Sequence, residues 1–293
     1  MLNKTIWLLW LQGWDDIPWL IKQVAESWEI NNPDWNIKYV TLSNLHEYVC
    51  DIDYIYDKTK EIEPQAKSDI IRLSLLRNHG GVWADATMLC MQPLSSWAEE
   101  ATKAAGVWMY HGSCGNPASW FILAEKDSLI MNKWKSACDE YWNSRTDADS
   151  YFWLDGLFKK LVDSDIEFKN LWNLVPYLYC NAEGQAHSME GRNFDLMVGT
   201  NQQLQKIFQE QPPYALKFWW KVWQENFSDV NSTECKNSNG YFAIQMSKRK
   251  FIFRHKMTSK SYYMKLFFGI ERFLGKMVDV LKGNVKNLLK SFK

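Results

Sequence analysis

The 293-residue sequence lacks the short motifs that mark the commonest nucleotide-binding and hydrolytic sites. It has no G-x-x-x-x-G-K-S/T phosphate loop and no G-x-G-x-x-G turn, so we expect neither a P-loop NTPase nor a dinucleotide-binding Rossmann site. It also has no G-x-S-x-G nucleophile elbow and no H-E-x-x-H metal motif, which argues against the hydrolases built on them. No repeat with a period of about 20–50 residues is visible, so a solenoid is not expected.

The six cysteines form neither a C-x-x-C pair nor a Cys/His zinc spacing. The N-terminus enters an apolar run almost directly and shows no cleavable signal pattern. Both features favour a reducing cytosol with free thiols. We therefore expect the N-x-S/T sequons at Asn3, Asn226 and Asn231 to stay unused.

The composition allows a large buried core. Hydrophobic residues make up 46% of the chain, which argues against global disorder and is enough for one large α/β domain. Tryptophan is abundant, at 17 residues, and we expect most of these side chains to lie in the core.

The formal net charge of zero hides an asymmetry along the chain. Residues 248–293 contain 13 Lys or Arg and 2 Asp or Glu, which leaves 21 basic and 32 acidic residues in the rest. A basic end on an acidic body favours an anionic surface as the partner of that end. We expect no nucleic acid among the partners.

The start of the chain is typical of a strand–helix–strand unit. Residues 5–11 are a continuous apolar run, residues 17–30 fit a helix, and residues 36–42 alternate as a second strand. Such a unit implies parallel strands and therefore an α/β fold. We also predict strands over residues 88–91, 104–110, 119–124, 241–246 and 250–253, and helices over 46–60, 127–143, 149–162, 202–209 and 215–226.

Residues 68–90, SDIIRLSLLRNHGGVWADATMLC, hold the most informative pattern. Asp69 and Arg72 are three residues apart and project from one side of a predicted helix. The Gly-Gly pair at 80–81 ends that helix, and a short buried strand follows. Asp85 then stands at the carboxyl end of this strand, where open α/β sheets bind ligands. This arrangement suits a polyhydroxyl ligand and a metal-bound diphosphate; the alternative is a surface ion pair and a turn residue.

The order of these features resembles glycosyltransferase family 32. The shared pattern is S-D-hydrophobic-hydrophobic-R, then G-G-V-W, then an Asp-x-Asp-like triplet, which here is Asp85-Ala86-Thr87. The chain looks most similar to the bacterial capsular polysaccharide synthesis proteins and more distantly like the glucosylating toxins. The resemblance implies a GT-A (Rossmann-like) nucleotide-sugar-binding domain with a mixed central sheet over residues 1–260.

The resemblance also implies an activity and a location. Members of this kind move a sugar, with retention of configuration, from a nucleotide diphosphate sugar to an acceptor. We expect a UDP-sugar as donor, a hexose as the group moved, and a glycan or lipid-linked oligosaccharide as acceptor, in capsule or O-antigen synthesis. The expected location is the cytoplasm, peripheral on the inner face of the plasma membrane.

Four residues are the expected catalytic set on this resemblance: Asp69, Arg72, Asp85 and Asp155. Asp155 follows a Tyr-Phe pair on a predicted helix and would face the donor sugar; the alternative is a solvated helix residue. Residues 165–240 give few signals, and we expect acceptor-binding elements there.

Further residues are expected to bind the donor together with Asp69, Arg72 and Asp85. Trp10 lies at the end of the first predicted strand and would stack on the nucleobase, unless it lies in the core. A late basic loop would reach the diphosphate through His255, Lys256 and Lys260, unless it is an ordinary basic stretch.

The triplet departs from the family's pattern because its third position is Thr87 instead of an acid. A hydroxyl is a weaker ligand than a carboxylate for Mn²⁺ or Mg²⁺. We expect a divalent cation on Asp85, Thr87 and His255, completed by the diphosphate and water. The departure also motivates a second hypothesis, a catalytically silent membrane-bound scaffold of a polysaccharide assembly complex. A glycoside hydrolase is disfavoured, because the Asp69–Arg72 pair offers no obvious acid with a raised pKa.

Residues 261–293 are typical of a basic amphipathic helix. Apolar residues recur there at helical spacing, among them Leu266, Ile270, Phe273 and Met277. Charged residues interrupt every apolar run, so the segment cannot span a bilayer. A stripe of this kind with lysines beside it suits a membrane surface; the alternative is packing on the catalytic domain or at a dimer interface.

Overall fold

The computed structural model describes residues 1–182, 185–186, 206, 208, 210–227 and 232–248. Residues 1–175 and 179–250 group into one compact unit, and residues 176–178 and 251–293 into a second. All elements named below belong to the first unit. The predicted strand over 250–253, the predicted helices over most of 202–209 and over 261–293, and His255, Lys256 and Lys260 lie outside the described residues.

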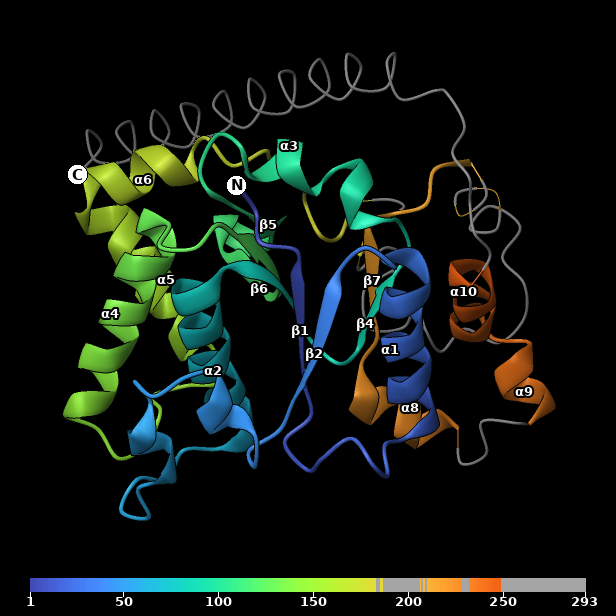
Figure 1. Cartoon of the computed structure of the whole chain (residues 1–293), viewed down its shortest axis with the longest axis horizontal. Coiled ribbons are helices and arrows are strands. Elements are labelled where there is room, and N and C mark those ends of the chain that lie inside the picture. The colour runs from blue at the N-terminus through green and yellow to red at the C-terminus, as the bar shows by residue number, and fades with distance from the viewer. Residues whose placement is uncertain (183–184, 187–205, 207, 209, 228–231, 249–293) are drawn as a thin grey trace, which may run out of the picture. The chain divides into compact units, whose positions relative to one another are not determined.

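A five-stranded mixed sheet with the strand order β2-β1-β3-β6-β5 forms the centre of this unit (Figure 1). Its strands are β1 (Thr5–Leu9), β2 (Asn36–Val40), β3 (Gly81–Ala84), β5 (Val107–His111) and β6 (Pro117–Ala124). β1 is parallel to β2 and β3, whereas β6 is antiparallel to β3 and β5. The predicted α/β class and mixed sheet are confirmed. The carboxyl ends of β1, β2 and β3 meet at one edge of the sheet.

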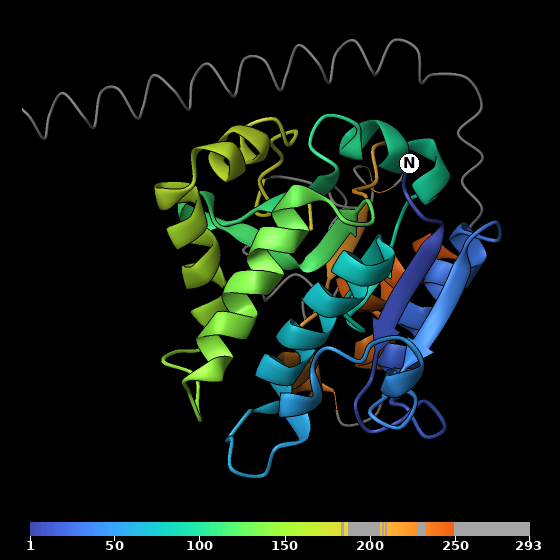
Figure 2. The same cartoon turned by 60° about the vertical axis from the view of Figure 1, so that its left-hand side comes forward.

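Helices cover both faces of the sheet. On one face α1 (Trp19–Asn31) places Trp28 against Phe121 of β6, with ring centroids 5.6 Å apart. On the other face α2 (Pro64–His79) packs on β3 and β6. α4 (Leu129–Asn143) lies beside α2 and α5 (Trp153–Ser164) beside α4, as Figure 2 shows from a second side. α10 (Asn239–Ser247) lies beside α1 (Figure 1).

Shorter elements complete the described part of the unit. They are the helices α3 (Ala98–Thr102), α6 (Ile166–Trp172), α8 (Trp220–Asn226) and α9 (Thr233–Lys236), and 3₁₀ turns at Leu45–Glu47, Asp53–Tyr56, Leu94–Ser96 and Ser113–Gly115. A separate two-stranded sheet pairs β4 (Met88–Cys90) antiparallel with β7 (Ala215–Lys217). Among the described residues, no helix has the length and apolar character needed to cross a membrane.

The Gly-Gly pair joins α2 to β3 with almost no room for side chains. Gly80 has φ +69° and Gly81 has φ +98°, a region that favours glycine. A Cβ atom on Gly81 would lie 2.4 Å from the carbonyl oxygen of Thr5 in β1. Trp7 of β1 donates its indole N–H to the Gly80 carbonyl oxygen at 2.9 Å and is 3% exposed, so it is one of the tryptophans that lie in the core.

Three sequence-based assignments are wrong. Residues 46–60 form only short 3₁₀ turns instead of a helix. Residues 215–217 form a strand, whereas the sequence predicts a helix that begins at residue 215. Residues 241–246 lie in α10 instead of a strand, because the Ser238 hydroxyl accepts a hydrogen bond from the Tyr241 N–H at 3.0 Å and caps a helix there.

Candidate active site

The site is built around Arg72, which projects from the middle of α2 and is 4% exposed. Its Nη1 lies 3.0 Å from Oδ1 of Asp69 and donates to Oγ of Ser119 at 2.9 Å. Its Nη2 donates to Oδ1 of Asp85 at 3.2 Å. The guanidinium also lies over the Trp83 ring, 5.3 Å from its centroid. One buried fork therefore joins the helix to the end of β3 and to β6.

Asp85 follows the last residue of β3, as the sequence predicts, and its side chain is 22% exposed. Its backbone N–H donates to the Trp120 carbonyl oxygen at 2.9 Å, which fixes the turn. Oδ1 accepts from the Trp83 indole N–H at 2.9 Å as well as from Arg72. Oδ2 accepts from Lys217 at 2.6 Å. Both carboxylate oxygens are thus held by donors within the chain.

Lys217 completes this network, and the sequence-based prediction missed it. The pairing of β7 with β4 places Lys217 opposite Met88, and its side chain is 10% exposed. Its ammonium donates to Asp85 and also to the Thr87 hydroxyl at 2.9 Å, and lies 6.0 Å from the Trp120 ring centroid. The available signal was a single lysine inside the apolar run of residues 214–220, since a buried charge needs a partner.

Asp155 joins the cluster electrostatically from the first turn of α5. It is half-buried, and burial raises its pKa to about 6 although the Arg72 charge opposes the rise. The predicted catalytic residues Asp69, Arg72, Asp85 and Asp155 are therefore brought together by α2, β3 and α5.

The two carboxylates on the Arg72 fork differ in their affinity for protons. Burial raises the pKa of Asp69 to about 7; the Arg72 charge opposes this rise, and the charges of Asp85 and Asp155 add to it. Burial also favours protonation of Asp85, but the charges of Lys217 and Arg72 outweigh it and lower the pKa of Asp85 below its ordinary value. The expectation that the Asp69–Arg72 pair offers no acid with a raised pKa is therefore wrong. Asp69 is 3% exposed, so it acts on a ligand mainly through its neighbours.

Trp10 stands just beyond β1, at the same sheet edge as Asp85. It is half-buried and meets the Trp220 ring edge-on, with centroids 6.4 Å apart. Its backbone N–H donates to the Val40 carbonyl oxygen at 3.0 Å, which anchors it to the end of β2. The residue thus presents part of an aromatic surface at the edge where the charged cluster lies.

The predicted metal ligands Asp85 and Thr87 lie together, but both accept hydrogen bonds from the Lys217 ammonium. The third predicted ligand, His255, lies outside the described residues. Within the described part of the chain, no group of three or more His, Cys, Asp or Glu is arranged to hold a metal ion. As arranged, Asp85 and Thr87 suit a monovalent ammonium and do not fit a divalent cation, and metal binding stays a prediction.

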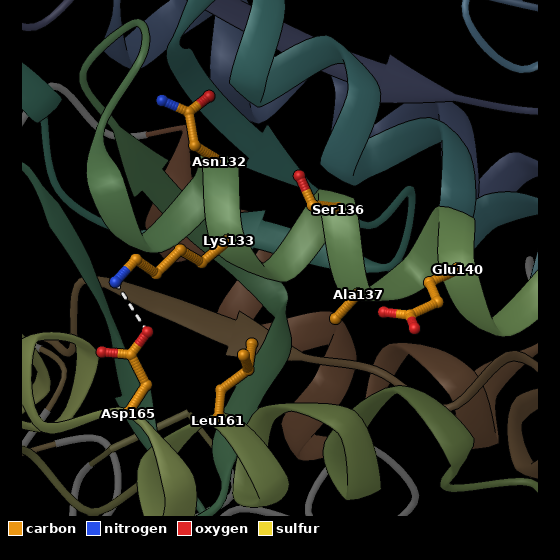
Figure 3. Close-up of a pocket in the computed structure, with 7 residues that line it drawn as sticks. All are labelled: Asn132, Lys133, Ser136, Ala137, Glu140, Leu161 and Asp165. Atoms are coloured by element: carbon orange, nitrogen blue, oxygen red, sulfur yellow. Dashed lines mark hydrogen bonds and ion pairs between the residues drawn. The ribbon is translucent and has the colours of Figure 1, made fainter.

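Figure 3 shows a groove elsewhere on the unit, between α4, α5 and the start of α6. It is lined by Asn132, Lys133, Ser136, Ala137, Glu140, Leu161 and Asp165. Its lysine is already paired, because Nζ of Lys133 lies 2.6 Å from Asp165 and 2.9 Å from Glu167. None of its lining residues belongs to the Arg72 cluster, and we assign no chemistry to it.

Comparison with known proteins adds several similarities. A curated relative, "Glycosyltransferase afumC" from Aspergillus fumigatus (strain CBS 144.89 / FGSC A1163 / CEA10), is 26% identical over 163 residues, 49% of this chain and 42% of that protein. The chain thus spans less than half the length of that relative. Among solved structures, the PaToxG glycosyltransferase matches 59% of this chain and 72% of its own, with 17% identity and a TM-score of 0.39. The UDP-bound glycosyltransferase domain of the YGT toxin matches 80% and 82%, with 10% identity and a TM-score of 0.33.

A family model described as "Capsular polysaccharide synthesis protein" matches residues 1–218. This stretch contains Asp69, Arg72, Asp85, Asp155 and, one residue before its end, Lys217. Because the match covers most of the chain and every described member of the charged cluster, the chain belongs to the capsular polysaccharide synthesis protein family.

Proposed function

We propose that this protein is a retaining glycosyltransferase of the GT-A type, within glycosyltransferase family 32. It moves a hexose from a nucleotide diphosphate sugar, with a UDP-sugar favoured, to a glycan or lipid-linked acceptor. The observation that carries the proposal is the fork of Arg72, which holds Asp69 and Asp85 at the edge where parallel strands end. Buried charges are weak contributors to stability, so such a cluster in a partly open position favours a functional site.

The cluster offers complementary groups for the two halves of a nucleotide diphosphate sugar. The carboxylates of Asp85 and Asp155 accept hydrogen bonds from sugar hydroxyls, and their charge stabilises an oxocarbenium-like centre, as in glycoside hydrolysis. Arg72 and Lys217 supply positive charge for the diphosphate. Asp85, Arg72 and Lys217 lie within one network of contacts of 2.6 to 3.2 Å, and Asp155 joins it electrostatically, so both kinds of group are placed to act on the same ligand.

The proposed reaction exchanges one bond at the anomeric carbon for another. The bond from C1 of the sugar to the diphosphate oxygen breaks, and its electron pair leaves with the diphosphate. The acceptor hydroxyl oxygen forms the new bond to C1, and its proton passes to the departing diphosphate. Retention requires the acceptor to arrive on the face that the diphosphate leaves. Positive charge beside the departing oxygen lowers the barrier because charge develops there in the transition state.

The aromatic surface at Trp10 supplies a place for the base of the nucleotide. Trp10 and Trp220 meet edge-on beside the carboxyl end of β1, and stacking of a base on an aromatic ring contributes roughly 1–3 kcal/mol. Stacking tolerates any base, so it supports a nucleotide donor without selecting uridine.

The family supports a place in surface polysaccharide synthesis. We extend this to the inner face of a plasma membrane, on the sequence-based prediction that residues 261–293 bind an anionic surface. In that arrangement a lipid-linked acceptor and the cluster meet at the same membrane face.

Ligand binding tests the proposal first. The full chain is heated with UDP-, GDP- and other nucleotide sugars, and a ligand at about 100 times its Kd is expected to stabilise the folded state by roughly 2.7 kcal/mol, which is a shift of several degrees in Tm. Release of nucleoside diphosphate is then measured with the stabilising donor. If a donor binds but no acceptor leads to release of nucleoside diphosphate, the silent scaffold is favoured. If no donor stabilises the protein and no nucleoside diphosphate is released, the proposal is refuted.

A further inference from the structure

Lys217 is held in the cluster by its backbone as well as by its ion pair. β7 pairs with β4 in a register that sets Lys217 opposite Met88. The N–H of the next residue, Phe218, donates to the Thr87 carbonyl oxygen at 2.9 Å. The lysine is therefore tied to the same Asp85–Thr87 turn through main chain and side chain, and its ammonium has little freedom to leave.

The Lys217 ammonium donates hydrogen bonds to Asp85 and Thr87, the two described residues that the sequence predicts as metal ligands. Nζ lies 2.6 Å from Oδ2 of Asp85 and 2.9 Å from Oγ1 of Thr87. The other Asp85 oxygen, Oδ1, accepts from Arg72 and Trp83. A divalent cation at this turn needs oxygen ligands at about 2.0–2.6 Å, so it would have to displace the ammonium or lie against it with the same sign of charge.

A single carboxylate together with substrate phosphates is enough for Mg²⁺ at many sites, so the small number of acids does not by itself argue against a metal ion here. The Lys217 ammonium does argue against one, because it stands where such an ion would bind. An ammonium has three N–H bonds. In the described part of the chain, Asp85 and Thr87 take two of them. The third is available for a phosphate oxygen, and 10% of the side chain is exposed to let one approach.

We propose that Lys217 is the resident cation of this site and binds the diphosphate of the donor in place of a divalent metal ion. The inference rests on the proposed function, since it assigns the group that meets the leaving diphosphate. It has a direct consequence: a nucleoside diphosphate binds the metal-free protein, and binding depends on Lys217.

The test measures binding of UDP to the full chain by calorimetry, in excess EDTA and in millimolar Mn²⁺, with GDP and CDP as further probes. Binding in EDTA is expected to be at least as tight as in Mn²⁺, because Mn²⁺ also binds UDP in solution and competes with the protein for it, and this comparison requires no variant. Lys217→Met is expected to weaken binding in EDTA about tenfold or more, the loss of one charge-assisted hydrogen bond. Lys221→Met is the matched control, because Lys221 is exposed on the neighbouring helix α8.

A second readout follows the metal itself by electron paramagnetic resonance of Mn²⁺. Wild type is expected to bind no Mn²⁺ beyond the amount that UDP alone binds, whereas Lys217→Ala exposes Asp85 and Thr87 and is expected to bind additional Mn²⁺. Circular dichroism shows whether each variant is folded. If Lys217→Met and Lys217→Ala do not fold, Lys217→Arg, which keeps a cation, replaces them in the binding measurement.

Three results overturn the inference. If EDTA abolishes UDP binding by wild type and Mn²⁺ restores it, a metal is required and Lys217 is not the resident cation, while the proposed function stands. If Lys217→Met binds UDP as Lys221→Met does, the lysine does not meet the diphosphate. If no nucleoside diphosphate binds in either solution, the proposed function fails together with this inference.

Discussion

Replacement of Arg72 by lysine keeps the positive charge and is nevertheless expected to damage the protein. The guanidinium joins Asp69, Asp85 and Ser119 through two nitrogens at 2.9 to 3.2 Å. An ammonium is a single point on a flexible stem, so it reaches one of these oxygens well and leaves the others without a donor.

The size of the effect follows from these contacts. A hydrogen bond to a charged group contributes roughly 1.5–3 kcal/mol, and the lysine loses about two of them. The Arg72 side chain is 5% exposed, so water cannot replace the lost donors. We expect Arg72→Lys to lower the free energy of unfolding by roughly 3–5 kcal/mol. The same loss around Asp85 is expected to lower kcat/KM about 100-fold or more.

The assay pairs urea unfolding, followed by tryptophan fluorescence, with release of nucleoside diphosphate from the active donor. Arg77→Lys is the matched control on the same helix. Arg77 is 36% exposed and lies 4.0 Å from Asp51, so its replacement is expected to change stability by less than about 0.5 kcal/mol. If Arg72→Lys matches Arg77→Lys in both measurements, Arg72 is not the centre of the site.

Three further perturbations test Asp69, Trp10 and residues 261–293. Asp69 is expected to make stability fall as pH rises from about 4 to about 7, because its folded pKa of about 7 lies above the ordinary value of 3.8 and the folded state binds more protons in that window. Urea unfolding across this range measures how the free energy of unfolding changes with pH. Asp155 adds to the fall up to about pH 6. If Asp69→Asn shows the same pH dependence as wild type, the raised pKa does not belong to Asp69. Trp10→Ala is expected to weaken UDP binding by about fivefold or more through lost stacking, with circular dichroism as the check on folding; unchanged affinity places the ring outside the base site. The full chain is expected to sediment with anionic liposomes at low salt and to be released at high salt, because each basic residue near the surface contributes roughly 1 kcal/mol; a chain ending at Lys260 that sediments equally well refutes a membrane role for residues 261–293.

Local patterns were sufficient to predict the part of the site that one segment builds. Asp69, Arg72 and Asp85 lie within 17 residues of sequence, and a helix, two glycines and a short strand fix their relation. Asp155 comes from a distant helix, but its place after an aromatic pair made it identifiable by resemblance. The two glycines allowed the end of the helix to be predicted, because their backbone conformation and close packing exclude other residues.

The local pattern marks Lys217 as a buried charge but could not predict its partner, because the partner depends on a strand pairing between distant segments. A run of apolar and aromatic residues around it fits a helix as well as a strand, and only the partner β4 decides. The error in α10 has a similar origin. Its residues have the apolar and aromatic character of a short strand, and the cap at Ser238 and the packing against α1 select the helix.

The long separation between Asp85 and Lys217 also has a consequence for how the protein is made. The two residues are 132 positions apart, so at about 5–20 residues per second Asp85 leaves the ribosome roughly ten seconds before its lysine. During this interval the nascent chain carries Asp85 with Arg72 as its cation, and the edge of β4 that β7 later covers lacks its partner strand. Arrival of β7 supplies the second cation and pairs that edge in one step, so on the inference drawn above the diphosphate site is completed together with the β4–β7 sheet.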